Sequence, residues 1–361
     1  MKVTLENVIK TFTKEQILNY KNYFEVLRLH RKNISKSNIF KKVNVSEDKI
    51  YQWRYTSIKP NSVKTIEEAK RRGYFKPISK KKLDALAYLI GYNLGDGNVS
   101  RNLCNVWFYG INSDLEDIRT LLLNFNVNPV IYTYKINNGK MAVHDRVFSR
   151  FLVCLGAVIG DKTMGRVSVP GWILDSGNAS LLKKRFLQGY CDSELSIISQ
   201  VKGKSCCYNS LKVYTSKHNC NLDNGFFFFG QLRELFREFS VLTSDVKFDR
   251  KYLRKRDGSE MQQMYFVIPT NYLNLYNFIR NIGFRYNAKR KTSSVTCLNS
   301  IKDKLEHETE KVEKYELALK LSQEGLSAYK IAKMLDIETY HVKNWLYFKK
   351  KPRLYNQISS S

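Results

Sequence analysis

The chain has 361 residues, of which 43% are hydrophobic, so it is long enough for two or three folded domains. Lys and Arg number 61 against 33 Asp and Glu, which gives a formal net charge of +28. A compact protein with this charge repels itself unless a polyanion neutralises it, and the composition favours nucleic acid as that polyanion. A membrane surface is the competing partner, but the sequence contains no lipidation signal and no apolar run long enough to span a bilayer.

The N-terminus and the cysteines indicate an intracellular protein. No apolar segment follows the start MKVTLENVIK, so we expect no secretory signal. The chain has 7 cysteines at irregular spacing and no CxxC pair, which predicts neither a zinc ribbon nor a disulfide framework.

The first predicted element is a helical module in residues 1–75. Residues 23–60 align without gaps with residues 315–352, and the alignment pairs Trp53 with Trp345 and Pro60 with Pro352. The pattern predicts a helix-turn-helix at each end of the chain, whose second helix presents donors to the major groove. In the N-terminal copy these donors are Lys49, Gln52 and Arg54. A helical hairpin used for packing alone is the alternative interpretation.

A second repeat divides the middle of the chain into a first half (residues 84–180) and a second half (residues 181–295). LIGYNLGDGNVS and FLQGYCDSELSI pair Gly91 with Gly189, Asp96 with Glu194 and Val99 with Ile197 at constant spacing. Further on, FLVCLGAVIGDK and FIRNIGFRYNAK pair Lys162 with Lys289. Apolar and polar periodicities predict a helix, two strands, a helix, two strands and a helix in each half, an α+β core.

Small residues four positions apart mark the first helix of each half. Gly91 and Gly95 lie on one face of the first of these helices, and Gly189 and Ser193 lie on one face of the second. Two such faces allow two helix backbones to approach closely, as small-residue motifs do in membranes. Parallel packing would bring Asp96 and Glu194 together at two negative helix ends, which is unfavourable unless a cation lies between them. We therefore predict a site for Mg²⁺ or Mn²⁺ that hydrolyses phosphodiesters.

These paired motifs resemble those of LAGLIDADG homing endonucleases of the two-motif, single-chain type, and VSVPGWILDS resembles that family's linker between halves. The resemblance covers residues 84–295. It implies a pseudo-symmetric, duplicated αββαββα core that acts as a monomer on double-stranded DNA. Asp96 and Glu194 would be the catalytic, metal-binding acids, and the carbonyls of Gly95 and Ser193 would assist them. The cut would leave short 3′ overhangs.

The same resemblance implies a saddle of strands over the DNA. Candidate DNA-contacting residues lie on or beside those strands: Arg101, Trp107, Tyr109, Tyr132, Tyr134, Lys212, Tyr214, Lys247 and Arg250. The matched Lys162 and Lys289 are expected near phosphates. One departure is Leu195, which stands where the family has Gly, so we expect the geometry of the second metal-binding acid to be altered.

The last predicted segment is residues 301–361. Residues 301–320 contain no Gly or Pro and predict a connecting helix. A helix-turn-helix follows: Ser327 would cap a helix from Ala328 to Leu335, and a second helix would bury Val342 and Trp345. Its outward residues are Tyr340, Lys343 and Asn344.

The sequence therefore predicts a free-standing, metal-dependent, site-specific DNA endonuclease with no obligate protein partner. The alternative is a LAGLIDADG-type transcription regulator or RNA maturase that binds nucleic acid without cutting it. An intein is disfavoured, because the sequence has no nucleophile at its start and no terminal His-Asn pair.

Overall fold

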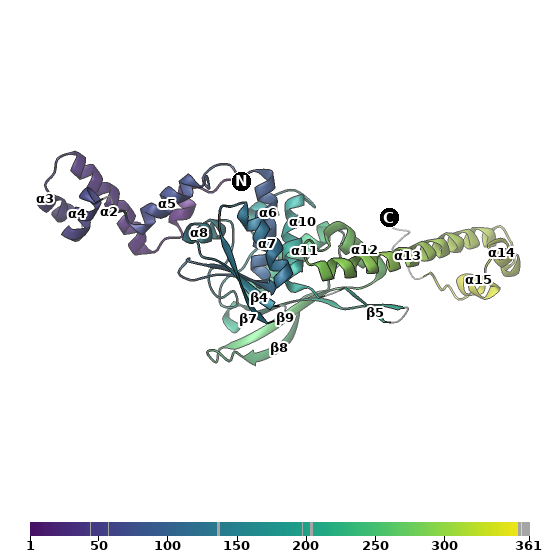
Figure 1. Ribbon diagram of the computed structural model, residues 1–361. Coiled ribbons are helices and arrows are strands. Elements are labelled where there is room, and N and C mark those ends of the chain that lie inside the picture. Colours follow the sequence, from purple (N-terminus) through teal and green to yellow (C-terminus); the bar gives the residue numbers. More distant parts are fainter. Residues whose placement is uncertain are drawn as a thin grey trace.

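Two helices, α6 (Lys80–Asp96) and α10 (Leu181–Glu194), lie side by side at the centre of an elongated molecule (Figure 1). This computed structural model describes residues 1–352 and Tyr355, apart from positions 44, 57, 136, 137, 197, 203 and 204. Ile197, which the sequence repeat pairs with Val99, thus lies outside the described residues. The described chain is a mixture of helices and small antiparallel sheets.

The first half has the predicted order of elements. After α6 come β1 (Gly97–Val99), β2 (Val106–Ile111), α7 (Asn112–Leu123), β3 (Pro129–Lys135), β4 (Asn138–Val143) and α8 (Arg146–Cys154). The strands form one antiparallel sheet in the order β1-β2-β4-β3. Alternation along β2 buries Val106 and Phe108 and leaves Trp107 and Tyr109 on the outer face. A short helix, α9 (Gly171–Leu174), precedes α10.

The second half differs from the prediction, because three strands rather than two follow α10. Its elements are β5 (Ser199–Lys202), β6 (Ser205–Tyr208), β7 (Leu211–His218), a 3₁₀ turn (Asn219–Asn221), α11 (Leu222–Glu238), β8 (Lys247–Leu253), β9 (Glu260–Ile268), α12 (Tyr272–Asn277) and a π-helical turn (Phe278–Ile282). In the described residues β5 and β6 pair with each other as a separate hairpin. The main sheet of this half is β7-β9-β8. The hairpin of β5 and β6 thus accounts for the extra strand.

Helical modules extend from both ends of this core (Figure 1). The N-terminal elements are α1 (Leu5–Ile9), α2 (Lys14–Arg31), α3 (Lys36–Lys42), α4 (Glu47–Tyr55) and α5 (Asn61–Arg71). The C-terminal elements are α13 (Ala288–Gln323), α14 (Ala328–Met334) and α15 (Thr339–Leu346). Residues 301–320 are helical as predicted, but α13 is longer, with 36 residues, and begins within the range predicted as the second half. Asn287 caps its start, and no Gly or Pro interrupts it.

Three separate buried clusters stabilise these parts. The largest surrounds α6 and α10. A second joins α2 to α4 around Trp53, and a third joins the end of α13 to α14 and α15 around Trp345. Ser327 caps α14, and Val342 and Trp345 are buried, as predicted. None of the helices in the described part of the chain is both long and apolar enough to cross a membrane.

Candidate active site

The two central helices touch backbone to backbone through their glycines. A Cβ atom on Gly91 would lie 2.0 Å from the carbonyl oxygen of Phe186, and one on Gly189 would lie 2.1 Å from that of Tyr88. One turn further along both helices, a Cβ on Gly95 would lie 1.9 Å from Ser193 Oγ. The contacts advance in the same direction on both helices, so α6 and α10 run parallel and end together. Side chains larger than hydrogen at these glycines would force the helices apart.

The parallel packing brings Asp96 and Glu194 to one place. Glu194 lies over the last turn of α6, since a Cβ on Gly95 would be 3.1 Å from Glu194 Cγ. Burial, followed by the negative charge of Asp96, raises the pKa of Glu194 to about 7. Burial of the carboxyl group also raises the pKa of Asp96, although the residue as a whole is exposed. The pKa shifts of both carboxyl groups therefore show that the surrounding protein does not fully stabilise their negative charges.

Lys162 reaches the carboxyl end of α6 from the segment that follows α8 in the first half. Its Nζ donates to the carbonyls of Asn93 at 3.1 Å and Leu94 at 3.0 Å, and also to that of Gly95. These carbonyls belong to the final helical turn, which carries the negative end of the helix dipole, and that of Asn93 also accepts from the N–H of Gly97. Burial lowers the pKa of Lys162, and the charges of Glu194 and Asp96 oppose that shift.

A different residue performs the same task at the end of α10. Arg290 Nη1 donates to the carbonyl of Asp192 and, at 3.3 Å, to that of Cys191. The repeat had matched Lys162 with Lys289, but Lys289 is exposed on the first turn of α13 and its neighbour Arg290 faces the site. Arg290 thus occupies at α10 the place that Lys162 occupies at α6, and the expectation that Lys289 lies near phosphates stays a prediction.

Leu195 does not impose the backbone crowding that the sequence suggested. Its backbone is extended, with φ −82° and ψ 148°, and its side chain is fully buried. Gly97, at the matching position after α6, is also extended, with φ −121° and ψ 172°. Both backbone conformations are allowed for residues other than glycine, so Leu195 follows Glu194 without backbone strain. At Gly97 the neighbouring Asn93 still excludes a side chain, since a Cβ there would lie 2.5 Å from Asn93 Cα.

The carboxylates fit a hard divalent cation. Asp96 and Glu194 offer carboxylate oxygens, which are the ligands that such a cation prefers. No group of three or more His, Cys, Asp or Glu side chains that could hold a metal ion occurs among the described residues. Further ligands would thus be carbonyl, water or phosphate oxygens, which Mg²⁺ accepts readily. The Gly95 carbonyl accepts a hydrogen bond from Lys162 and has a second lone pair, and Ser193 Oγ donates to the Tyr190 carbonyl at 2.8 Å.

Two cavities open beside this centre. One, of about 230 Å³, is bordered by Lys162, Glu194 and Tyr214. The other, of about 780 Å³, brings Arg101, Trp107 and Tyr109 of the first half together with two arginines of the second half, Arg254 and Arg256. Lys162 and Thr163 border both cavities, so the segment that carries Lys162 separates them.

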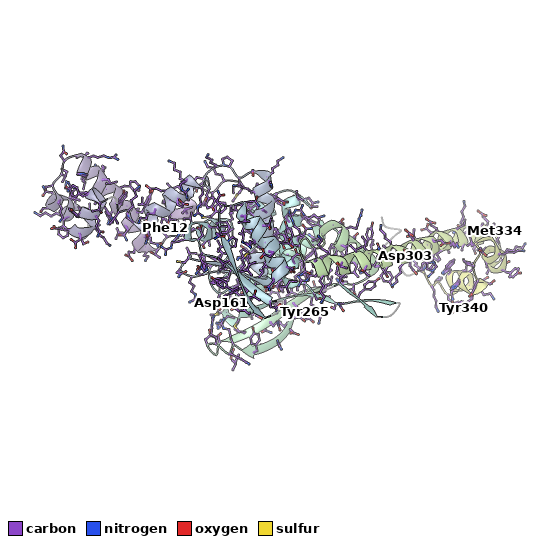
Figure 2. All side chains as sticks on the ribbon, viewed as in Figure 1. Phe12, Asp161, Tyr265, Asp303, Met334 and Tyr340 are labelled. Carbon is purple, nitrogen blue, oxygen red and sulfur yellow. The ribbon has the colours of Figure 1, made fainter. Side chains whose placement is uncertain are left out.

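The outer faces of the two sheets carry the predicted aromatic and basic residues. On the first sheet, Tyr132 and Tyr134 of β3 lie beside Lys140, whose Nζ is 4.5 Å from the ring centroid of Trp107. On the second sheet, Lys212 Nζ lies 5.1 Å from the ring centroid of Tyr265, which Figure 2 labels below the helices. Sequence reasoning missed Lys140 and Tyr265, although both fall on the outer face of the alternation in β4 and β9.

The remaining predicted DNA contacts are accessible to different degrees. Lys247 and Arg250 are exposed on β8. On α4, Lys49 and Gln52 are exposed and Arg54 is half-buried. On α15, Tyr340 and Lys343 are exposed and Asn344 is half-buried, at the far end of the molecule from α4 (Figures 1 and 2).

No protein-family model matches the chain. It is similar to the tRNA-splicing ligase RtcB of Pyrococcus furiosus, at 24% identity over 260 residues, which cover 67% of this chain and 25% of that protein. The chain thus spans about a quarter of the length of the curated relatives it matches.

Structural neighbours include LAGLIDADG proteins at low similarity. The homing endonuclease I-DmoI matches with a TM-score of 0.34 and 13% identity, over 56% of this chain and 97% of that one. Full-length DUF199/WhiA from Thermatoga maritima matches with a TM-score of 0.36 and 13% identity, over 77% of this chain and 93% of that one. Structures of I-DmoI with DNA were solved with Mn or Ca.

Proposed function

We propose that this chain is a site-specific double-strand DNA endonuclease of the LAGLIDADG type that requires Mg²⁺ or Mn²⁺. The observation that carries the proposal is the meeting of Asp96 and Glu194 at the ends of two parallel helices. Burial, followed by the negative charge of Asp96, raises the pKa of Glu194 to about 7, so the nearby cations of the protein do not fully offset the cost of ionising it. A divalent cation held by both carboxylates would relieve that cost.

In this proposal Asp96 and Glu194 hold the cation, with the Gly95 and Ser193 carbonyls beside them. The bound cation would supply an attacking water of lowered pKa and stabilise the leaving oxygen. Lys162 and Arg290 offset the negative ends of α6 and α10. Both cations lower the pKa of Glu194, and so both help to keep the pair ionised.

The substrate is proposed to be duplex DNA because of the charge and the sheet faces. A formal net charge of +28 favours a phosphate backbone as partner. The two sheets present arginine, lysine and aromatic side chains on their outer faces, which suit contacts with phosphates and base edges. The two halves would form a pseudo-symmetric saddle, with Lys162 near phosphates. Since one chain supplies both acids, the enzyme would act as a monomer.

The deciding experiment compares the wild type with an Asp96→Asn/Glu194→Gln double variant on a randomised duplex library with Mg²⁺. The wild type should cut a defined subset of duplexes, and the double variant should bind the same duplexes without cutting them. Wild-type protein that retains duplexes and never cuts would favour a transcription regulator. Equal cutting by the double variant would place the active site elsewhere. The similarity to RtcB covers a quarter of that protein, so its ligase activity is no part of the proposal.

The end modules are proposed to be helix-turn-helix units that extend the recognised site. Their second helices, α4 and α15, expose Lys49, Gln52, Tyr340 and Lys343. Deletion of residues 1–75 or 310–361 should weaken duplex binding and reduce its salt dependence, because a protein with fewer phosphate contacts releases fewer counterions on binding. Filter binding over a salt series measures both quantities. Unchanged affinity and slope would assign the modules to protein contacts.

A further inference from the structure

A buried lysine of the second half lies directly under the segment that carries Lys162. Lys217 is on β7 and is 1% exposed, and its side chain points to the inner face of the sheet with those of Leu211 and Val213. Its Nζ donates to the carbonyl of Lys162 at 2.7 Å, to that of Gly165 at 3.0 Å and to Asn224 Oδ1 at 3.1 Å. All three protons of the ammonium group therefore have acceptors.

The segment between Asp161 and Val169 has no helix or strand of its own. Apart from a turn in which the N–H groups of Met164 and Gly165 donate to the Asp161 carbonyl, the second half supplies many of its hydrogen bonds. The backbone N–H of His218 donates to the Thr163 carbonyl at 3.1 Å. Asn221 Nδ2 donates to the Gly165 carbonyl at 2.7 Å. The Asn224 side chain accepts from the Val167 N–H at 2.8 Å and donates to the Val167 carbonyl at 2.9 Å. The path of this segment is thus held by groups on β7, on the 3₁₀ turn that follows it and on α11.

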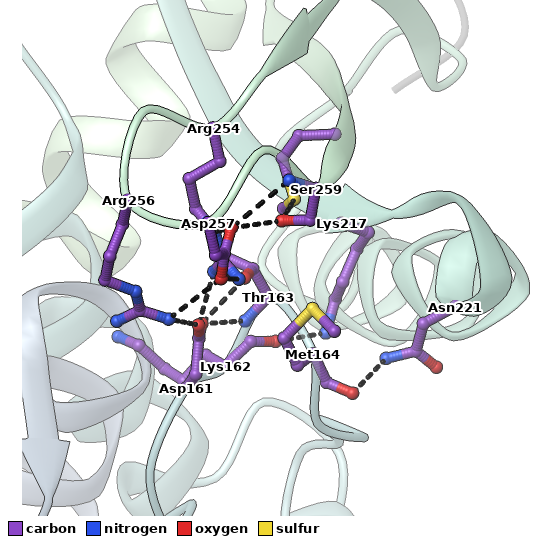
Figure 3. Close-up of polar contacts among 11 residues, drawn as sticks. Asp161, Lys162, Thr163, Met164, Lys217, Asn221, Arg254, Arg256, Asp257 and Ser259 are labelled. Atoms are coloured by element: carbon purple, nitrogen blue, oxygen red, sulfur yellow. Dashed lines mark hydrogen bonds and ion pairs between the residues drawn. The ribbon is translucent and has the colours of Figure 1, made fainter.

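The outer side of the segment is held by the turn between β8 and β9 (Figure 3). Arg254 and Arg256 both pair with Asp161, the residue before Lys162. Arg254 also donates to the hydroxyl of Thr163 at 3.1 Å. The Asp161 carboxylate in turn accepts from the N–H of Thr163 at 3.0 Å. The backbone of Lys162 is therefore fixed on its buried side by Lys217 and on its outer side by this turn.

We propose that Lys217 is a positioning residue that holds the backbone of Lys162, so that the Lys162 amine stays at the carboxyl end of α6 beside Asp96 and Glu194. This inference rests on the proposed endonuclease function. Lys217 does not face the site itself, because its amine ends on backbone carbonyls of the segment. Through Lys217, the sheet of the second half fixes Lys162, whose positive charge lies beside Asp96 of the first half.

The alternative is that Lys217 only fills space in the core. Burying an ammonium group is unfavourable unless its hydrogen bonds are used, and an apolar side chain would fill the same volume without that penalty. Burial and the nearby Lys162 lower the pKa of Lys217 to about 8, so the group is held at a cost. Its stem also passes Gly225 of α11, where a Cβ would be 3.0 Å from Lys217 Cγ, so α11 leaves room for it.

The test compares Lys217→Met with Lys183→Met in the full-length protein. Lys183 is a matched control because it is also buried, at 5% exposure, and its Nζ pairs with Glu238 at 2.7 Å at the other end of α10. Three quantities are measured: hydrogen exchange of residues 161–169, duplex affinity, and the single-turnover cutting rate at saturating Mg²⁺. Asn221→Ala, which removes one bond to the Gly165 carbonyl, is a milder variant should Lys217→Met fail to fold.

Lys217→Met should raise exchange in residues 161–169, leave duplex affinity unchanged and lower the cutting rate on the order of 100-fold, as a misplaced catalytic group does. Asn221→Ala should act in the same direction with a smaller effect, and Lys183→Met should change neither exchange nor rate. Unchanged exchange in both loop variants would overturn the proposal, as would equal loss of cutting in Lys217→Met and Lys183→Met. If the wild type cuts no duplex, the endonuclease proposal fails, and hydrogen exchange still decides whether Lys217 holds the segment.

Discussion

The carboxyl ends of α6 and α10 both carry the negative end of a helix dipole and an acidic residue, and each is neutralised by a cationic side chain from a different part of the chain. At α6 the cation is Lys162, which comes from an irregular segment held by the second half. At α10 it is Arg290, which comes from the first turn of α13. One end thus depends on a loop and the other on a long helix. The two ends can therefore be perturbed independently, although their carboxylates interact.

The largest effect is expected from replacing the two cationic side chains, Lys162 and Arg290. Lys162→Met and Arg290→Met should each lower the single-turnover cutting rate by about 10²–10³-fold, the usual loss when one preorganised electrostatic group is removed. Lys289→Met, on the exposed neighbour, should leave the rate unchanged. Rates are measured at saturating Mg²⁺ on the selected duplex. If Lys289→Met is as slow as Arg290→Met, Lys289 would be the functional counterpart of Lys162, as the sequence repeat suggested.

The glycine contacts test whether the two helices need each other. Gly91→Ala places a Cβ 2.0 Å from the Phe186 carbonyl oxygen, so the free energy of unfolding should fall by about 3 kcal/mol, at the upper end of overpacking effects. Gly189→Ala should cost a similar amount, because its Cβ would meet the Tyr88 carbonyl. Gly230→Ala on α11 is the control: no atom lies within 4 Å of its Cβ, and the alanine should stabilise the helix by about 0.5–1 kcal/mol. Urea denaturation measures all three, and equal effects at Gly91 and Gly230 would contradict the close approach.

The smallest expected effect is a pH dependence centred on Glu194. Its folded pKa, about 7, exceeds the ordinary value of 4.5, so the folded state binds an extra proton between these values. The metal-free protein should therefore lose stability as pH rises from 4.5 to 7, and a divalent cation should restore it above pH 7. Apparent Ca²⁺ affinity should rise by at most about tenfold per pH unit up to pH 7 and then level off. Thermal unfolding with and without Ca²⁺ measures this, and Glu194→Gln should remove most of the dependence; the same slope in that variant would assign it to other groups.

The sequence could predict the site where residues act through local spacing. Glycines four positions apart and two acids at matching positions sufficed to predict a parallel helix pair with Asp96 and Glu194 together. Their roles in catalysis, the duplication and the modules stay predictions. Lys217 and Arg290 could not be found in this way, because their partners are backbone carbonyls distant in sequence. No side-chain pattern records such contacts. The sequence predicted two strands after α10 and the structure has three, because β5 and β6 pair with each other as a hairpin outside the main sheet.

The length of α13 has a consequence for how much DNA the protein could recognise. At 1.5 Å per residue this helix is about 54 Å long. Arg290, in its first turn, lies at the end of α10, and the cluster around Trp345 is packed on its last turns. At 3.4 Å per base pair that length corresponds to about 16 base pairs of B-DNA. A C-terminal module that binds the same duplex as the core would therefore read bases well beyond the cut and on one side of it, and the spacing between cut and contact would be set by the number of helical turns.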